Sequence, residues 1–290
     1  MTYSTKYPVN TMKHSRISLL ISSFAIAIFG GLFMAAPSVQ ATEITTSLIN
    51  TAIAKEESPE VLTAEQRKAI LKEVISASQH EIATLTETLN DLKLDDAWSL
   101  ARDHFVATLA TSSEYYTGLE TRLAEEDISL DEIKSIAADL KEWRETTYTP
   151  ALKETGNLIL IIQTETVHGV VQLRATKIGN DIKKLDKQKL VNTDVLKKYL
   201  AQAEHSLKNA QILTDKAKDI YFTASVVPFQ PKKEGSADKL NSIAPQEQSP
   251  AEELAEIDSQ DQVRDLAKES LKEIKAAYEL FFKMNDRIRK

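Results

Sequence analysis

Glu165 and His168 are an acidic residue and a histidine at the three-residue spacing that places both on one side of a helix. In di-iron and di-manganese bundles, a Glu-x-x-His pair on each of two helices joins two further Glu residues around the metals. The other three histidines after residue 41 lack an acidic residue three positions earlier, so the second pair is missing. Glu165 and His168 are therefore a candidate metal or small-ligand site, with a solvated or hydrogen-bonded histidine as the alternative.

Aromatic residues gather at two places in the sequence, and four side chains from them form a candidate binding patch: Tyr115, Trp143, Arg144 and Tyr148. Tyr115 precedes a tyrosine on the apolar stripe of its helix, so Tyr115 itself must point away from that stripe. The alternative is a packing seam, where the segment before Pro150 lies against the preceding long helix.

Cysteine is absent from the sequence, which excludes a disulfide, a thiol nucleophile and a thiolate metal site. The sequence also lacks a Gly-x-Ser-x-Gly elbow, a glycine-rich phosphate loop, a calcium-binding loop and a His-Glu-x-x-His motif. Its many carboxylates are typical of charged helix faces and caps. We therefore predict no catalytic residue and no cofactor, with a site assembled from residues distant in the sequence as the alternative.

Long helices must position these side chains, because the composition favours helix and offers few turn signals for a sheet. Thr63 and Gln66 have the spacing of a capping box, and Ser129 with Glu132 repeats it. Apolar residues recur at alternating steps of four and three. This spacing predicts helices over about 64–92, 96–127, 130–147, 150–187, 194–224 and 251–290.

Pro150 interrupts the apolar pattern, and because proline suits a first helical turn we expect a new helix or a sharp kink to begin there. The apolar run from Leu158 to Ile162 marks this helix as the central one. A β-strand over Leu158 to Val171 is the alternative, because periodicity does not separate short apolar runs. Small polar residues on the stripes, such as Thr214 and Ser270, predict either close helix packing or a small internal cavity.

The fold class is therefore all-α: an elongated antiparallel bundle of helices of about 30 residues, with a C-terminal helix tethered by a Pro-rich linker. The predicted parts are a signal over 1–41, a flexible lead-in over 42–62, the helical bundle over 63–224, the linker over 225–250 and the C-terminal helix over 251–290. The heptad-like helices could also pair between two chains as a coiled coil, so self-association is a candidate property.

The first 41 residues have the pattern of a secretory signal. Three basic residues, Lys6, Lys13 and Arg16, precede an uncharged stretch from Ile17 to Ala36, and none of the first 41 residues is acidic. Pro37 then breaks the helix, and Ala41 is the expected last residue before signal cleavage. The alternative is an uncleaved anchor, because 20 uncharged residues can cross a hydrocarbon core of about 30 Å; the Gly30-Gly31 pair argues against a firm membrane helix.

The net charge is −7 for the whole chain and −10 once the three cations of residues 1–41 are removed. An acidic exported chain is a poor partner for nucleic acid or for anionic lipid. We therefore expect a protein or envelope component as partner, and membrane contact only through residues 17–36 if they are retained.

The sequence thus predicts a secreted or extracytoplasmic protein of the cell envelope with a non-catalytic binding or scaffolding role. One alternative is a single-pass, membrane-anchored extracytoplasmic bundle. The other is a bundle that binds a metal or small ligand through Glu165 and His168.

Overall fold

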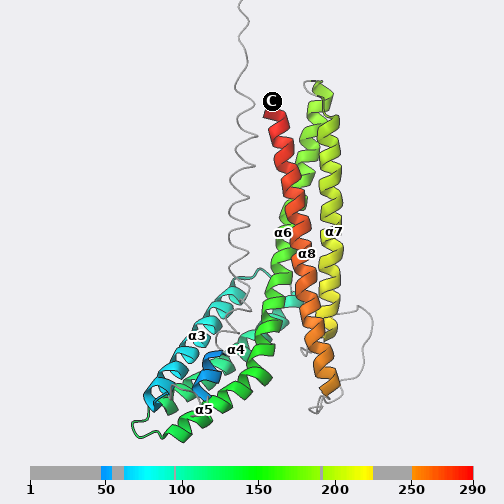
Figure 1. Ribbon diagram of the computed structural model, residues 1–290. Helices are drawn as coiled ribbons and strands as arrows, with labels where there is room; N and C mark the ends of the chain where they lie inside the picture. The colour runs from blue at the N-terminus through cyan, green and yellow to red at the C-terminus, as the bar shows by residue number, and fades with distance from the viewer. Residues whose placement is uncertain (1–46, 54–61, 95, 190–191, 225–249, 290) are drawn as a thin grey trace, which may run out of the picture. The chain divides into compact units, whose positions relative to one another are not determined.

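The computed structural model describes residues 47–53, 62–94, 96–189, 192–224 and 250–289 (Figure 1). Every regular element in these ranges is helical, and none of their residues forms a strand. The all-α prediction is confirmed, and the alternative of a strand over Leu158 to Val171 is wrong. The predicted signal, its cleavage after Ala41 and nearly all of the Pro-rich linker lie outside the described residues.

Two helices of equal length begin where the sequence predicts. Helix α3 (Ala64–Asp91) starts with the complete capping box, in which Thr63 and Gln66 accept hydrogen bonds from each other's backbone N–H. Helix α4 (Asp96–Leu123) ends four residues before the predicted position, because the chain turns at Ala124 and Glu125. The predicted stripes are buried in both helices, except for Leu92, which follows the end of α3 and is half-buried. The spacing of apolar residues, in steps of three and four, is therefore sufficient to locate these two helices.

The lead-in that precedes α3 contains a short helix over residues 47–53. Ile49 and Ala52 of this helix are buried. Arg67 of α3 is also buried; its guanidinium donates to the carbonyl of Ala52 and to that of Leu62, the latter at 3.3 Å. A buried guanidinium needs such acceptors, so Arg67 fixes part of the predicted lead-in to α3.

The helix predicted to start at Pro150 begins at Thr149, but no break separates it from the preceding segment, because one helical run continues through Pro150. This run consists of α5 (Leu130–Trp143), the π-helical segment η1 (Arg144–Tyr148) and α6 (Thr149–Gln188). Within it, the N–H of Thr149 bonds to the carbonyl of Arg144, five residues earlier. In a regular α-helix the ring of a proline crowds the carbonyl four residues back. The wider π turn just before Pro150 lets the helix continue.

The spacing of buried residues explains the π turn. From Leu140 the buried positions advance by four residues three times in a row, through Arg144 and Tyr148 to Leu152. Each step of four turns an α-helical stripe by about 40°, so three such steps would carry it about 120° away from the core. The extra residue of a π turn absorbs this rotation. The same face of the helix therefore stays buried on both sides of η1.

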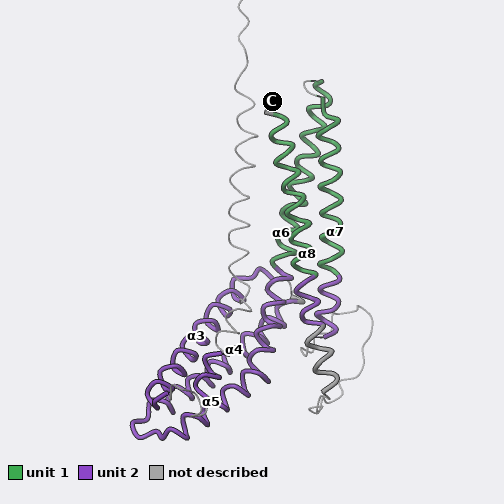
Figure 2. The backbone as a smooth tube through the Cα atoms, viewed as in Figure 1, with its two compact units in different colours: residues 1–34, 163–215, 266–290 green, residues 35–162, 216–265 purple. Residues whose placement is uncertain are grey.

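The remaining helices are α7 (Asp194–Ala224) and α8 (Pro250–Arg289). Their predicted stripes are buried, with Leu200 and Ile288 partly so. The chain divides into two compact units, shown in green and purple in Figure 2. Among the described residues, unit 1 takes those within 163–215 and 266–290, and unit 2 those within 35–162 and 216–265. The boundaries fall inside α6, α7 and α8.

The core of unit 1 is formed by one face each of α6, α7 and α8, with Val171, Leu207 and Phe281 among its fully enclosed members. Hydroxyl groups lie within this core. Ser270 donates to the carbonyl of Ala210 at 2.8 Å, and the hydroxyls of Thr214 and Ser270 are themselves 2.8 Å apart. The sequence predicted either close helix packing or a small internal cavity at such residues. At Thr214 and Ser270 the structure has close helix packing.

Unit 2 combines α3, α4, α5 and η1 with the adjoining parts of α6, α7 and α8. The ring of Trp98 on α4 lies 4.7 Å from that of Phe222 on α7. The buried amide of Asn157 on α6 donates to the backbone and side-chain oxygens of Gln260 on α8, both at 2.8 Å. Lys153 pairs with Asp261 at 2.8 Å beside them.

None of the described helices combines the length and the apolar character that a membrane span requires.

Candidate functional site

Arg144 is a buried charged side chain of unit 2, and it is only 3% exposed. Its Nη1 donates to the hydroxyl of Ser78 and to the phenol of Tyr116, each at 2.6 Å. A buried cation is tolerated only where hydrogen bonds and opposite charge replace its hydration. Because Ser78 belongs to α3 and Tyr116 to α4, one guanidinium joins three elements.

Tyr148 connects this group to a carboxylate. It is fully buried, and its hydroxyl lies 3.0 Å from Glu81 Oε2 and 3.3 Å from the carbonyl of Ser78, to both of which it can donate. The guanidinium of Arg144 lies 5.0 Å from the centre of the Tyr148 ring, within the range of a cation–π interaction. We call Ser78, Glu81, Tyr116, Arg144 and Tyr148 the Arg144 network.

Burial controls the protonation of this network. It raises the pKa of Glu81 above its ordinary value of 4.5, while the hydrogen bond from Tyr148 and the charge of Arg144 act in the opposite direction. Burial also raises the pKa of Tyr116 to about 12. The pKa of Tyr148 is raised by burial and by the neighbouring Glu81 charge. Both phenols therefore keep their protons at neutral pH and act as hydrogen-bonding groups rather than as bases.

The four residues of the predicted patch come together in the structure. Tyr115 stacks on Trp143 with ring centres 4.0 Å apart, and Trp143 stacks on Tyr148 at 5.6 Å. Arg144 and Tyr148 are buried, whereas Tyr115 and Trp143 are half-buried. The ring of Tyr116 meets Trp143 edge-on, at 5.2 Å and 89°. The outer part of the group, Tyr115 and Trp143, is the part that a ligand could reach.

Replacing Trp143 with Ala is expected to lower the free energy of unfolding by about 2–3 kcal/mol, below the roughly 3–5 kcal/mol of a fully buried aromatic residue. The indole packs against three tyrosine rings, so its removal leaves a cavity beside η1. Urea unfolding measures the change, with Phe282→Ala, a half-buried aromatic residue of α8, as the comparison. A Trp143 variant as stable as the parent would contradict the packing role and leave the indole available to a ligand.

The candidate metal residues lie in unit 1. The ring Nε2 of His168 on α6 is 2.9 Å from the carbonyl of Leu207 on α7. A carbonyl oxygen can only accept, so Nε2 carries the proton and holds the two helices together. Glu165 lies three residues earlier on α6 and is half-buried. Within the described residues, no three His, Asp or Glu side chains gather as a metal ligand set.

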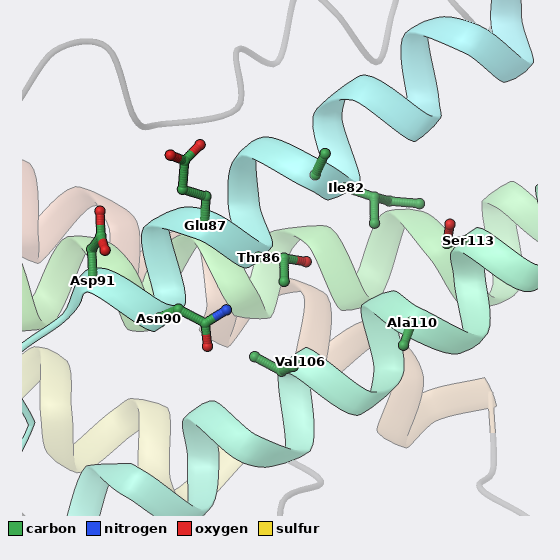
Figure 3. A pocket seen from close by; sticks show the side chains of 9 residues that line it. Ile82, Thr86, Glu87, Asn90, Asp91, Val106, Ala110 and Ser113 are labelled. Atoms are coloured by element: carbon green, nitrogen blue, oxygen red, sulfur yellow. The ribbon is translucent and has the colours of Figure 1, made fainter.

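A hollow between α3 and α4 is a feature that the sequence analysis missed. It measures about 590 Å³, and Figure 3 shows the side chains around it. Nine residues line it: Ile82, Ala83, Thr86, Glu87, Asn90 and Asp91 from α3, and Val106, Ala110 and Ser113 from α4. We call it the α3–α4 trough. Most of these residues lie beside the apolar stripes rather than on them, which is why the periodicity did not reveal the trough.

Comparison of the chain with protein-family models, with characterised proteins and with solved structures finds no match.

Proposed function

We propose that this protein is exported and acts as a non-catalytic binding or scaffolding protein at the cell envelope or outside the cell. The observation that carries the proposal is the signal pattern of residues 1–41, in which cations, an uncharged stretch and Ala41 follow in the order that a secretory signal requires. The sequence contains no cysteine, so no disulfide can form and the stability of the folded part depends on packing.

The chemistry of the polar side chains supports a non-catalytic role. Tyr116, Tyr148 and Arg144 are groups that enzymes use, but here Arg144 contacts both tyrosines. Tyr148 also donates to the carbonyl of Ser78 on α3. His168 is likewise bonded to a backbone carbonyl of the neighbouring helix. These groups hold helices in place. We therefore assign the proposed binding role to the helix surfaces of the folded part.

Intact-mass analysis of the exported protein tests the proposal. With a C-terminal tag on the full chain, we expect a product outside the cytoplasm whose mass corresponds to a first residue at Thr42. A full-length product in the membrane fraction would instead support the anchored alternative. A full-length product in the cytoplasm would contradict both.

Two variants, each with one alanine replaced by leucine, test whether cleavage occurs at the predicted bond. Ala41→Leu places a large side chain at the predicted cleavage position and is expected to block processing. Ala36→Leu makes the same change five residues earlier and should leave processing intact. Equal processing of both variants would contradict cleavage after Ala41.

A further inference from the structure

The α3–α4 trough is long and open. Its lining spans residues 82–91 of α3 and 106–113 of α4. At 1.5 Å per residue, the α3 side is about 13 Å long, or two and a half helical turns. Five of the nine lining residues are exposed, and only Ile82 is buried. The trough is therefore a surface groove along two helices rather than an enclosed pocket.

The floor of the trough, formed by the lining residues other than Glu87 and Asp91, is largely apolar, and most of its side chains are small. Ile82, Ala83, Val106 and Ala110 supply the apolar surface, and Thr86, Asn90 and Ser113 add short polar groups. In Figure 3, Thr86, Asn90 and Val106 lie between the two helices, toward the hollow. Small residues allow the backbone of an incoming segment to approach closely. Such a floor suits the apolar side of another helix.

The charge of the trough has one sign. Glu87 and Asp91 stand one turn apart on α3, and no Lys, Arg or His is among the lining residues. Both carboxylates are exposed, and within the described ranges neither forms an ion pair. In Figure 3 both point away from α4, along one edge of the trough. Like charges at this spacing repel slightly, so a cation placed beside them is favourable.

These features select among three kinds of occupant. A small molecule would stay largely in solvent, whereas small-molecule pockets bury about 70–90% of their ligand. A second copy docked through the same face would bring its own Glu87 and Asp91 to an already acidic edge. An amphipathic helix with an apolar side and Lys or Arg along its flank matches both the floor and the edge.

We propose that the α3–α4 trough binds a cationic amphipathic helix of a partner protein, with the apolar side of that helix on the floor and its basic residues beside Glu87 and Asp91. This deepens the binding role proposed above and depends on it. It is tested on purified protein, so its failure would leave the export experiment unaffected, and failed export would not change the result here.

Fluorescence anisotropy with two labelled peptides tests the proposal. Both peptides are designed helices with Leu and Ala on one side; one carries Lys on its flanks and the other carries Glu at the same positions. The cationic peptide is expected to bind at least tenfold more tightly than its anionic twin, and its affinity should fall as salt rises. Equal binding of the two peptides, or no binding of the cationic one, would overturn the proposal.

Matched variants locate the binding. The double change Glu87→Gln and Asp91→Asn should weaken the cationic peptide at least fivefold. The control changes Asp215→Asn and Asp219→Asn neutralise another exposed acidic pair at the same spacing, on α7, and should leave the affinity unchanged. Ala110→Leu fills the trough and should weaken binding. Its control, Ala107→Leu, alters an exposed position of α4 outside the trough and should leave the affinity unchanged. Equal losses in the variants and their controls would indicate non-specific attraction and overturn the proposal.

Discussion

Replacing Arg144 with Met lowers the free energy of unfolding by about 3 kcal/mol near neutral pH, because removal of one partner from a buried charged group leaves the others uncompensated. The methionine fills part of the space but supplies no hydrogen bond to Ser78 or Tyr116. It also removes the positive charge that favours ionised Glu81. The expected loss lies at the lower end of the range for broken buried pairs because Glu81 is only half-buried.

The loss is expected to depend on pH in a defined direction. Burial already raises the pKa of Glu81 above 4.5, and loss of the Arg144 charge should raise it further. A carboxyl whose pKa is higher in the folded state than in the unfolded state binds more protons when folded, so stability falls as pH rises above 4.5 through the folded pKa. The variant should therefore lose less at about pH 4 than at about pH 7. Urea unfolding at both pH values measures the difference.

Two further variants separate charge from packing. Glu81→Gln in the Arg144→Met background should remove most of the pH dependence, because the group that titrates is gone. Arg102→Met removes a surface arginine paired with Asp103 at 2.7 Å, and should cost less than about 1 kcal/mol at either pH. Equal losses for Arg144→Met at both pH values would contradict the electrostatic explanation.

Deleting Thr176 is expected to cost several kcal/mol, whereas deleting Thr146 should leave the protein folded and cost clearly less. Both threonines are exposed, and each donates its hydroxyl to the carbonyl four residues earlier. Deletion in the regular part of α6 turns the following residues by about 100°. Ile182 would then leave the core of unit 1, and burial of one such side chain is worth about 1.5–3 kcal/mol.

Deletion within η1 has the opposite consequence for the buried face. Removing Thr146 converts the π turn to α-helix and shortens the second of the three consecutive steps of four to three. The spacing from Leu140 to Leu152 then becomes regular, and α6 keeps its orientation. Far-UV circular dichroism and urea unfolding of the two deletion variants provide the comparison. Equal destabilisation by both deletions would contradict the explanation of η1.

The sequence predicted the helices well because their signals are local. Thr63 and Gln66 are three residues apart and cap α3 without help from the rest of the chain. The apolar steps of α4 and α7 likewise need only neighbouring residues, and both stripes are buried as predicted apart from the partly buried Leu200. The π turn was not predicted, because each step of four is by itself compatible with an α-helix and only three in succession require the extra residue.

The site was only partly predictable. The aromatic residues and Arg144 were identified by type, but the role of Ser78 and Glu81 depends on α3 lying beside η1, which no local spacing reveals. The bond between His168 and Leu207 joins residues 39 apart. The boundaries between the two units fall inside continuous helices, where composition does not change. The features that the sequence did not predict are therefore those that depend on contacts between distant segments.

Helix α8 has a consequence for the cooperativity of unfolding. It supplies Gln260 to unit 2 and Ile274 and Phe281 to unit 1, so one helix contributes buried residues to both units. Local unfolding of α8 would remove these residues from both units at once. We therefore expect the two units to unfold together rather than one after the other.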